Sequence, residues 1–337
     1  MISIDRPYGL LNLGNTCYMN SVLQTLFLCN DFNTDIIRNS QPQGSLINGY
    51  KTIIIKMMQR SNTNSKVRKL KLTQFINKFR NNFQHVSFHQ QDAHEALQFI
   101  LGNFHDTLKE EFTSDHLVEN INSMRYNKEI KNECAKQLMT MYKKDYSLIN
   151  KYFYGQVCNV IRCSNCNHEV NRVEVYKGIE LSIEKSNDLF GCLEEHFAEE
   201  ELEGYKCDEC KKTQCSKQMV LLNTPKYLLV TLKRFNFSYQ TNRFAKNTKN
   251  VDFPIYLHFK KYLLQDNDNK KVNNSDLYKL KSVINHSGGA NNGHYTSYNN
   301  FKKKWVECDD DDVKIMDEDK IFTPAAYVLV YEKKDIN

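Results

Sequence analysis

The sequence contains few of the residues that interrupt regular structure. Its 337 residues include 5 prolines and 12 glycines, and neither type gathers in a long stretch. A Pro-rich spacer or a Gly-rich tether between domains is therefore excluded. We find no internal repeat either, so the pattern predicts a single compact domain over residues 1–337 with local insertions.

Long apolar runs are also missing. No stretch approaches the roughly 18 apolar residues of a membrane span, and Met1–Pro7 has neither a basic leader nor a long apolar segment. With 40% hydrophobic residues, the chain has enough apolar side chains for a substantial core. We expect a soluble globular protein that is neither secreted nor bound to a membrane.

Charge of one sign is not concentrated. The 46 basic and 40 acidic residues give a net charge of +6 and are dispersed, except for short patches such as Lys302–Lys304. This balance does not predict nucleic-acid binding. A zinc-dependent nucleic-acid binder, suggested by the pI of about 8.6, is kept only as a minor alternative.

Cysteine, in contrast, is plentiful. The chain has 11 cysteines, an odd number in a sequence without a secretion signal. This argues against a complete disulfide framework and favours free thiols or metal ligands in a reducing compartment. We therefore expect the protein in the cytoplasm, the nucleus or both.

The periodicity of the chain changes near its middle. Up to about residue 150 it is mainly helical, with helices predicted after Cys17, around Ile53–Met58, around Phe75–Phe83, after His89 and within an insertion at 113–150. From about Tyr152 short β-rich runs take over. They are found at 157–162, 170–176, 178–183, 227–235, 277–285, 295–298 and 327–331. Polar stretches at 236–250, 265–275 and 287–293 are predicted to be loops.

One cysteine lies where a tight polar loop becomes a helix. Gly14 permits a sharp turn, Asn15 and Thr16 are good N-cap types, and apolar residues then recur at helical spacing after Cys17. The positive end of a helix dipole favours a thiolate, so the pKa of this thiol is expected below its ordinary value. A buried inert cysteine is the plainer alternative.

A second group of polar residues lies near the other end of the chain. His294 follows a glycine-rich segment, and a run of aspartates, Asp309–Asp312, comes after Trp305. A thiol protease needs a base that takes and returns the proton, and a polar group that orients the imidazole. Cysteine, histidine and carboxylate are thus all present.

Four cysteines form two C-x-x-C pairs. The first is Cys163 with Cys166, and the second is Cys207 with Cys210. Four thiolates make a closed tetrahedral zinc site. Because the pairs are farther apart than in a compact zinc ribbon, intervening strands have to bring them together. Nearby residues without paired spacing are Cys158, Cys192, Cys215 and His168.

Taken together, these motifs resemble the catalytic domain of the ubiquitin-specific proteases. The motifs that carry the resemblance are the cysteine box 9–24, the block 90–95, both C-x-x-C pairs, the strand 228–235 and the histidine box 293–295. The resemblance implies an α+β, papain-like fold with a helical thumb, a β palm and zinc-bearing β fingers. The corresponding regions are 1–150 for the thumb, 151–225 mainly for the fingers with part of the palm, and 226–337 mainly for the palm with cleft-flanking loops.

The resemblance also implies roles for individual residues. Cys17 matches the nucleophile, His294 the general base, and Asn12 the side chain that donates to the oxyanion. Asp309 matches the residue that orients the histidine. At position 308, directly before Asp309, this chain has a cysteine where the family usually has a large apolar or aromatic residue. Because several aspartates follow one another, Asp310 is kept as an alternative to Asp309 or as a catalytic support.

The residues expected to bind the substrate follow from the same resemblance. They are Gln90, Gln91, Asp92, Gly293 and Tyr295. Asp92 would pair with an arginine of ubiquitin's extended C-terminal tail, although a carboxylate there is also explained as a helix N-terminal charge.

The implied function is hydrolysis of the bond after the C-terminal glycine of ubiquitin, through a Cys17 thioester. Ubiquitin and ubiquitinated proteins are the expected partners, one structural zinc the expected metal, and no catalytic cofactor is expected; the sequence does not identify regulatory partners. The alternatives are a protease for another ubiquitin-like modifier and a catalytically silent ubiquitin-binding module.

Overall fold

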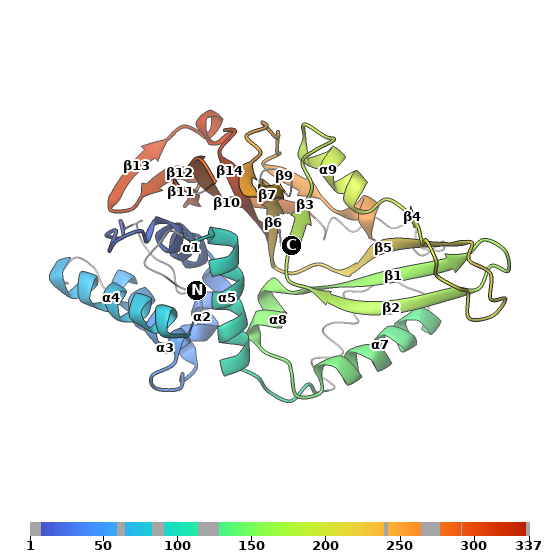
Figure 1. The fold of residues 1–337 in the computed structure, drawn as a ribbon. Coiled ribbons are helices and arrows are strands. Elements are labelled where there is room, and N and C mark those ends of the chain that lie inside the picture. The colour runs from blue at the N-terminus through green and yellow to red at the C-terminus, as the bar shows by residue number, and fades with distance from the viewer. Residues whose placement is uncertain are drawn as a thin grey trace.

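The computed structural model describes residues 8–58, 65–82, 91–113, 128–238, 242–263, 277–290 and 292–334. Helices come first in the chain and strands dominate after them (Figure 1). The helices are α1 (Cys17–Phe27), α2 (Asn30–Arg38), α3 (Leu46–Met58), α4 (Ser65–Asn82), α5 (Ala93–Thr107), α7 (Lys128–Tyr142), α8 (Leu148–Phe153) and α9 (Leu189–His196). This mixture confirms the predicted α+β class.

Most of the strands belong to two sheets. A four-stranded sheet has the order β2-β1-β5-β4, and an eight-stranded sheet has the order β13-β12-β11-β10-β14-β6-β3, with β9 paired to β10. Strands β7 and β8 form a separate hairpin. The strands of the smaller sheet are β1 (Gly155–Cys163), β2 (Glu169–Tyr176), β4 (Glu200–Glu201) and β5 (Cys215–Asn223).

The larger sheet contains the longest of the described strands, β10. Its strands are β3 (Ile179–Leu181), β6 (Tyr227–Leu232), β9 (Tyr256–His258), β10 (Leu277–Gly288), β11 (Gly293–Phe301), β12 (Lys304–Asp309), β13 (Asp312–Met316) and β14 (Ala326–Lys333). The hairpin strands are β7 (Phe235–Ser238) and β8 (Arg243–Lys246), and the 3₁₀ turns are η1 (Lys260–Tyr262) and η2 (Glu318–Ile321).

The larger sheet is buried on both faces. On β14, Val328 and Val330 join the apolar core under the N-terminal helices, whereas Leu329 and Tyr331 join a second core on the opposite face. This alternation is the two-residue repeat of a strand. The sheet is therefore the central layer of the molecule.

Helix α1 is buried on every side. Sequence periodicity predicts one buried face, but all residues of Cys17–Phe27 are buried because the helix lies between α5 and strands β10 and β11. Its polar side chains find internal partners. Gln24 donates to the carbonyl of Tyr8 at 2.5 Å, and Thr25 shares a hydrogen bond with Ser282 at 2.8 Å. A buried helix of this kind holds its first residue firmly in place.

The four-stranded sheet extends away from the helices as an arm, with α7 along it (Figure 1). Leu138 and Tyr142 of α7 pack on Cys158, Val160 and neighbouring strand residues. The far end of the arm holds a small cluster in which three of the four buried side chains are cysteines. The arm thus has its own core, separate from the two cores of the larger sheet.

Several predicted segments need correction. The loop expected at 236–250 contains the β7–β8 hairpin, and β10 and β11 enter the loop expected at 287–293, pairing Gly288 with Gly293. Helix α2 and strand β5 were not predicted, because α2 has only three apolar residues among nine and β5 starts with mainly polar residues before its apolar run 219–222. The loop expected at 265–275 lies outside the described residues.

A buried arginine fixes one of the connecting segments. Arg234 is 0% exposed, and its guanidinium donates to the carbonyls of Ala326, Asn247 and Lys249 at 2.6, 3.0 and 2.8 Å. Burial lowers the pKa of this guanidinium from its ordinary value. These bonds tie the segment after β8 to the first residue of β14.

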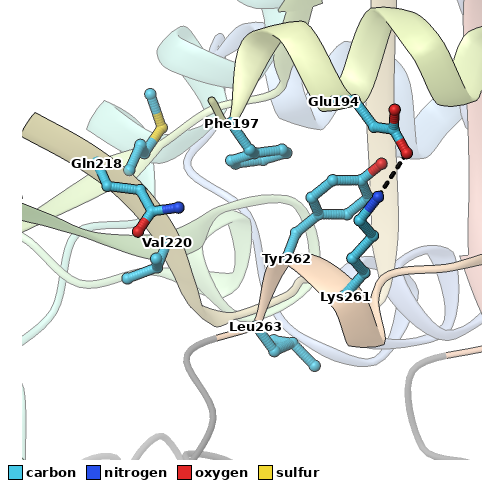
Figure 2. A pocket seen from close by; sticks show the side chains of 8 residues that line it. Glu194, Phe197, Gln218, Val220, Lys261, Tyr262 and Leu263 are labelled. Carbon is cyan, nitrogen blue, oxygen red and sulfur yellow. Dashed lines mark hydrogen bonds and ion pairs between the residues drawn. The ribbon is translucent and has the colours of Figure 1, made fainter. Parts of the chain in front are cut away.

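A cavity of about 240 Å³ lies where α9, β5 and η1 meet (Figure 2). An ion pair between Lys261 and Glu194, 2.5 Å apart, closes one side of it, and the rings of Phe197 and Tyr262 lie 4.9 Å apart on another. None of the predicted catalytic residues lines this cavity. Among the described residues, no helix has the length and apolar character needed to cross a bilayer.

Candidate active site

The loop before Cys17 has the sharp turn that its sequence predicts. Gly14 and Asn15 both adopt left-handed backbone conformations, with φ of 92° and 52°. Helix α1 then begins at Cys17, which is 2% exposed. Thr16 is the N-cap residue but its side chain makes no capping bond; instead its hydroxyl accepts from the N–H of Leu13 at 2.9 Å. The start of the helix is therefore not blocked by its own N-cap side chain.

Asn12 is held by both ends of its amide. Its Oδ1 accepts from the backbone N–H groups of Gly14 and Thr16 at 3.0 and 3.2 Å. Its Nδ2 donates to Oδ2 of Asp310 at 2.9 Å. Because an amide nitrogen carries two hydrogens, the second can be given to a ligand.

Asp310 connects this loop to the turn between β12 and β13. Its other oxygen, Oδ1, accepts from Nδ2 of Asn20 at 2.7 Å, and Asn20 also donates to the carbonyl of Leu10 at 3.1 Å. The carboxylate thus lies between two side-chain amides, those of Asn12 and Asn20. Asn20 is 2% exposed, so this contact belongs to the interior.

Backbone contacts reinforce the same junction. The N–H of Leu10 donates to the carbonyl of Asp310 at 2.7 Å. A Cβ atom at Gly9 would lie 2.2 Å from the carbonyl oxygen of Asp311, so only glycine fits there. The cysteine loop and the β12–β13 turn consequently dock backbone to backbone.

His294 and Asp309 lie next to each other on neighbouring strands. Nε2 of His294, on β11, is 2.6 Å from Oδ1 of Asp309, at the end of β12. The two side chains are 43% and 48% exposed, so the pair is open to solvent. Because Nε2 faces the carboxylate, Nδ1 is left for proton exchange with another group. Helix α1 packs directly on β11, and Cys17 shares an apolar cluster with Tyr295.

These acidic residues and His294 could also be considered as metal ligands. One ligand atom each from His294, Asp309 and Asp310 lies within 4.8 Å of the others. However, Asp310 already accepts from two amides and Asp309 faces the imidazole. This arrangement is typical of a histidine–carboxylate pair with a supporting acid.

The residues predicted to bind the substrate are placed differently from one another. Gln90 lies outside the described residues, and Gln91 is half-buried directly before α5. Asp92 is the N-cap of α5: Oδ1 accepts from the N–H groups of His94 and Glu95 at 2.7 and 3.1 Å. Its Oδ2 accepts from the hydroxyl of Tyr327 at 2.7 Å. Asp92 therefore has the helix-capping role that its position suggested.

Tyr295 is enclosed by the interior of the protein. It is 3% exposed, shares an apolar cluster with Ala93 of α5, and its ring centroid lies 4.5 Å from that of the His286 imidazole. The side chain therefore packs between α5 and the sheet, and its part in substrate binding stays a prediction. At Gly293 a Cβ atom would lie 2.0 Å from Nε2 of His286, so a side chain at this position would displace the imidazole.

His286 was not singled out in the sequence. It lies on β10, opposite Tyr295, and is 3% exposed. Burial lowers its pKa to about 4, and the nearby positive groups Lys246 and His294 act in the same direction. Among the described residues its Nδ1 has no hydrogen-bond partner. A neutral imidazole thus fills the space beneath the strand that carries His294.

The four paired cysteines meet at the end of the arm. Sγ of Cys163 is 3.6 Å from that of Cys210, and Sγ of Cys166 is 3.6 Å from that of Cys207. All four sulfurs lie within 4.8 Å of one another. In a tetrahedral zinc site with Zn–S bonds of about 2.3 Å, sulfurs are roughly 3.8 Å apart. The donor set therefore fits one zinc ion.

The two C-x-x-C segments have the same backbone geometry. The N–H of Asn167 donates to the carbonyl of Cys163 at 2.9 Å, and that of Lys211 donates to the carbonyl of Cys207 at 3.0 Å. Asn167 and Lys211, each directly after the second cysteine, have φ of 58° and 60°. Both segments thus turn in the same way to aim two thiols at one point.

The other candidate ligands are outside this group. His168, Cys158, Cys192 and Cys215 do not belong to the four-sulfur cluster. Sequence reasoning also missed Asn20, whose signal was a polar residue within the apolar repeat of α1, and His286, whose signal was a histidine immediately after a predicted buried strand.

Comparison with known proteins gives consistent matches over the whole chain. A family model described as ubiquitin carboxyl-terminal hydrolase matches residues 8–331. Ubiquitin carboxyl-terminal hydrolase 12 of Salmo salar is 29% identical over 351 residues, covering 98% of this chain and 91% of the relative. Ubiquitin carboxyl-terminal hydrolase 4 of Arabidopsis thaliana is 27% identical over 352 residues, covering 97% and 93%.

A solved structure shows the same fold. The SAGA Ubp8/Sgf11/Sus1/Sgf73 DUB module bound to ubiquitin aldehyde contains a chain that matches with a TM-score of 0.78 and 23% identity. The match covers 100% of this chain and 71% of that chain.

The buried imidazole of His286 predicts a specific loss of stability in acid. Its pKa is about 4 when folded and 6.5 in its ordinary environment, so the unfolded chain binds a proton first as the pH falls. Its contribution to stability is complete above pH 6.5 and is lost progressively down to pH 4, by about 3 kcal/mol in total. Urea unfolding across this range measures the change.

The matched variants are His286→Asn and His258→Asn. His286→Asn removes the buried imidazole, so its free energy of unfolding should fall less between pH 6.5 and pH 4 than that of the wild type. His258→Asn changes an exposed histidine on β9 and should show the same pH dependence as the wild type. Equal acid dependence in wild type and His286→Asn would contradict the assignment.

Proposed function

The chain belongs to the ubiquitin carboxyl-terminal hydrolase family and is a cysteine-type deubiquitinase, and from this premise we propose that Cys17, His294 and Asp309 carry out its reaction. The observation that carries the proposal is the 2.6 Å contact between Nε2 of His294 and Oδ1 of Asp309, on the strands that pack against the helix beginning at Cys17. That contact leaves Nδ1 of the imidazole for the thiol.

The proposed reaction has two halves. The Cys17 thiolate attacks the carbonyl carbon of ubiquitin's C-terminal glycine, and His294 gives its proton to the departing lysine amine as the C–N bond breaks. A thioester remains on Cys17. His294 then takes a proton from water, the resulting hydroxide attacks the thioester carbonyl, and the Cys17 thiolate leaves. Asp309 keeps the imidazole in the tautomer and orientation that both halves need.

We assign stabilisation of the oxyanion to Asn12 and a backbone N–H near Cys17. The second Nδ2 hydrogen of Asn12 would donate to the negative oxygen, because the first is given to Asp310. Loss of one such donor typically costs about 2.7 to 4 kcal/mol of transition-state stabilisation. Asp310 then acts as a positioning residue, held in turn by Asn20.

The tail of ubiquitin is proposed to enter near the N-terminus of α5. Gln90 and Gln91 would hydrogen-bond its backbone, and Gly293 would leave room for a narrow passage that admits a tail ending in glycines. Asp92 supplies negative charge for an arginine of the tail. Both of its oxygens already accept hydrogen bonds, so the exposed Glu95 on the same turn is proposed to share this role.

We propose that the four cysteines at the end of the arm hold one structural zinc ion. The metal would cross-link β1 to the segment before β5 and take no part in the chemistry. The arm is proposed as the fingers that hold the globular body of ubiquitin, with the N-terminal helices as the thumb and the larger sheet as the palm of a single catalytic domain. No catalytic cofactor, nucleic acid or membrane is required.

Partners and location follow from the same proposal. Ubiquitin and ubiquitinated proteins are the proposed substrates, in the cytoplasm, the nucleus or both. The structurally similar module was solved with ubiquitin aldehyde, which supports binding of ubiquitin by this fold. That module also contains partner proteins, and regulatory partners of this chain are not assigned.

The first prediction from the proposed function concerns covalent capture. Ubiquitin with a C-terminal electrophile should form a one-to-one adduct with the wild-type chain, because the Cys17 thiolate attacks the group in place of the glycine carbonyl. Cys17→Ala should form none, whereas Cys29→Ala, which removes another buried thiol, should react as the wild type does. Mass spectrometry of the intact chain measures the adduct.

Two further arms of the same experiment separate the alternatives. Probes made from other ubiquitin-like modifiers should react more slowly, and faster reaction with one of them would replace ubiquitin as the substrate. Turnover of a fluorogenic ubiquitin substrate should accompany the adduct; its absence would identify a silent binding module.

The second prediction distinguishes the two neighbouring aspartates. Asp309→Ala should lower kcat by up to about 10⁴-fold and alter its pH profile, because the imidazole loses its orienting partner. Asp310→Ala and Asn12→Ala should each lower kcat by about 10² to 10³-fold without altering that profile, because both affect the oxyanion donor.

A double variant tests the link between Asn12 and Asp310. Since they act as one unit, Asn12→Ala/Asp310→Ala should be no slower than the worse single variant. Asp312→Ala, in the same acidic run but paired with Lys314, is the control and should retain wild-type kcat. Multiplicative losses in the double variant would show that the two residues act independently.

The third prediction concerns the metal. Elemental analysis of the purified chain should find about one zinc per molecule, as a closed four-thiolate site requires. Cys166→Ser should lose the metal and raise KM for ubiquitin substrates more than it lowers kcat, whereas Cys192→Ser should retain it because that thiol is outside the cluster. Well under one zinc per folded wild-type chain would contradict the site.

A further inference from the structure

A fifth cysteine lies beside the four-sulfur cluster. Cys215, the first residue of β5, pairs directly with Cys163, the last residue of β1. Both are buried, at 5% and 2% exposure, and they share the small cluster at the end of the arm. The sulfur of Cys215 is not among the four that lie within 4.8 Å of one another.

The strand register brings these two thiols to the same face. Ser164 donates from its N–H to the carbonyl of its opposite residue, Gln214, at 2.9 Å. Hydrogen-bonded and non-hydrogen-bonded pairs alternate along antiparallel strands, so Cys163 and Cys215 form a non-hydrogen-bonded pair. Such pairs have Cα atoms about 4.5 Å apart, within the range that a disulfide spans. The backbone is therefore already suited to a bond between the two sulfurs.

Cys215 also borders a cavity at the end of the arm. Cys215 lines a cavity of about 850 Å³ together with the segment 199–204, whose residues are mainly exposed. The segment contributes four carboxylates, from Glu199, Glu200, Glu201 and Glu203, and Lys217 pairs with that of Glu200 at 3.4 Å. A field of this sign repels anions, so it favours a small neutral oxidant over a negatively charged disulfide.

We propose that Cys215 is a peroxide-sensitive thiol, and that its oxidation withdraws Cys163 from the metal-binding set through a Cys163–Cys215 disulfide. The proposal rests on the zinc site described under the proposed function. Four ligands complete a tetrahedral site, so Cys215 remains free for this chemistry when the site is filled.

The reaction balances in two steps. The Cys215 sulfur attacks one oxygen of hydrogen peroxide; the O–O bond breaks, the thiol is oxidised to a sulfenic acid, and one water is released. The Cys163 thiolate then attacks the Cys215 sulfur, forming the S–S bond and expelling hydroxide, which takes up a proton to give a second water. Two equivalents of a small thiol would reverse the oxidation.

Loss of Cys163 leaves three thiolates at the end of the arm. A site with three of its four ligands holds zinc less tightly, and the cross-link between β1 and the segment before β5 weakens. The catalytic residues are on other elements and are not altered. Oxidation is therefore expected to raise KM for ubiquitin substrates while kcat changes little once Cys17 has been reduced again.

The test follows zinc and disulfides directly. The full zinc-loaded chain is treated with hydrogen peroxide, released zinc is measured with a metal-sensitive dye, and proteolytic peptides are mapped by mass spectrometry. In the wild type a peptide linked through Cys163 and Cys215 should form at the same rate as zinc is released. Oxidised glutathione, which is negatively charged, should act more slowly than peroxide.

Matched variants decide the outcome. Cys215→Ser and Cys215→Ala should bind zinc normally, but under peroxide they should release it several-fold more slowly than the wild type does. Two substitutions at this position are used so that the test survives if one variant misfolds. Cys158→Ser is the control and should behave as the wild type does. Cys158 is buried on β1, the strand of Cys163, and lies opposite Val220.

Equal zinc release with and without Cys215, or a first disulfide formed only among the four ligands, would overturn the proposal. Absence of zinc before oxidation would contradict the metal site instead, and the disulfide map would still test the pair.

Discussion

The junction between the cysteine loop and the β12–β13 turn is the constraint on which the site depends. It joins residues from the two ends of the chain: Asn12 and Asp310 are 298 positions apart, yet their side chains meet at 2.9 Å. The junction includes backbone contacts, which Leu10 and Gly9 make with the β12–β13 turn. It also includes side-chain hydrogen bonds to the Asp310 carboxylate. If it opened, the loop before Cys17 would lose its fixed relation to the turn beside Asp309, although α1 would still pack on β11.

Burial is graded around this junction. Cys17, Asn20, Tyr295 and His286 are almost fully enclosed, whereas the side chains of His294 and Asp309 remain nearly half exposed. A close-packed interior resists displacement, so buried groups can hold exposed ones in register. His294 and Asp309 thus lie at the surface of a rigid support, whereas Cys17 lies beneath that surface as the first residue of α1.

Local features of the fold and the site could be predicted from sequence. Gly14 and Asn15 predict the turn before Cys17 because left-handed conformations favour these residue types, and the C-x-x-C spacing predicts that the four cysteines meet. The strand at 327–331 follows from a short continuous run of aromatic, β-branched and apolar residues, all of them buried. These predictions succeed because each depends on interactions within a few residues.

Features that depend on distant contacts were not predictable. The role of Asn20 exists only because Asp310 arrives from the other end of the chain, and α1 is buried on every side only because α5 and β11 enclose it. Tyr295 is buried because it shares an apolar cluster with Ala93 of α5. The contacts of Asp309 with His294 and of Asp310 with Asn12 depend on the geometry of the β12–β13 turn, since adjacent identical residues carry no local signal.

The path of the chain through the arm has a topological consequence. Between Cys166 and Cys207, 41 positions apart, the backbone leaves the arm along β2, adds β3 in parallel to β6 of the larger sheet, forms α9, and returns through β4. The proposed zinc ion would close this loop as a disulfide does, and a disulfide over a loop of this length stabilises the folded chain by about 4 kcal/mol. The arm and the larger sheet are therefore connected more than once by the chain, because it leaves the arm, adds a strand to the larger sheet and returns to the arm. Neither can be cut out or transplanted as a module without taking an edge of the other.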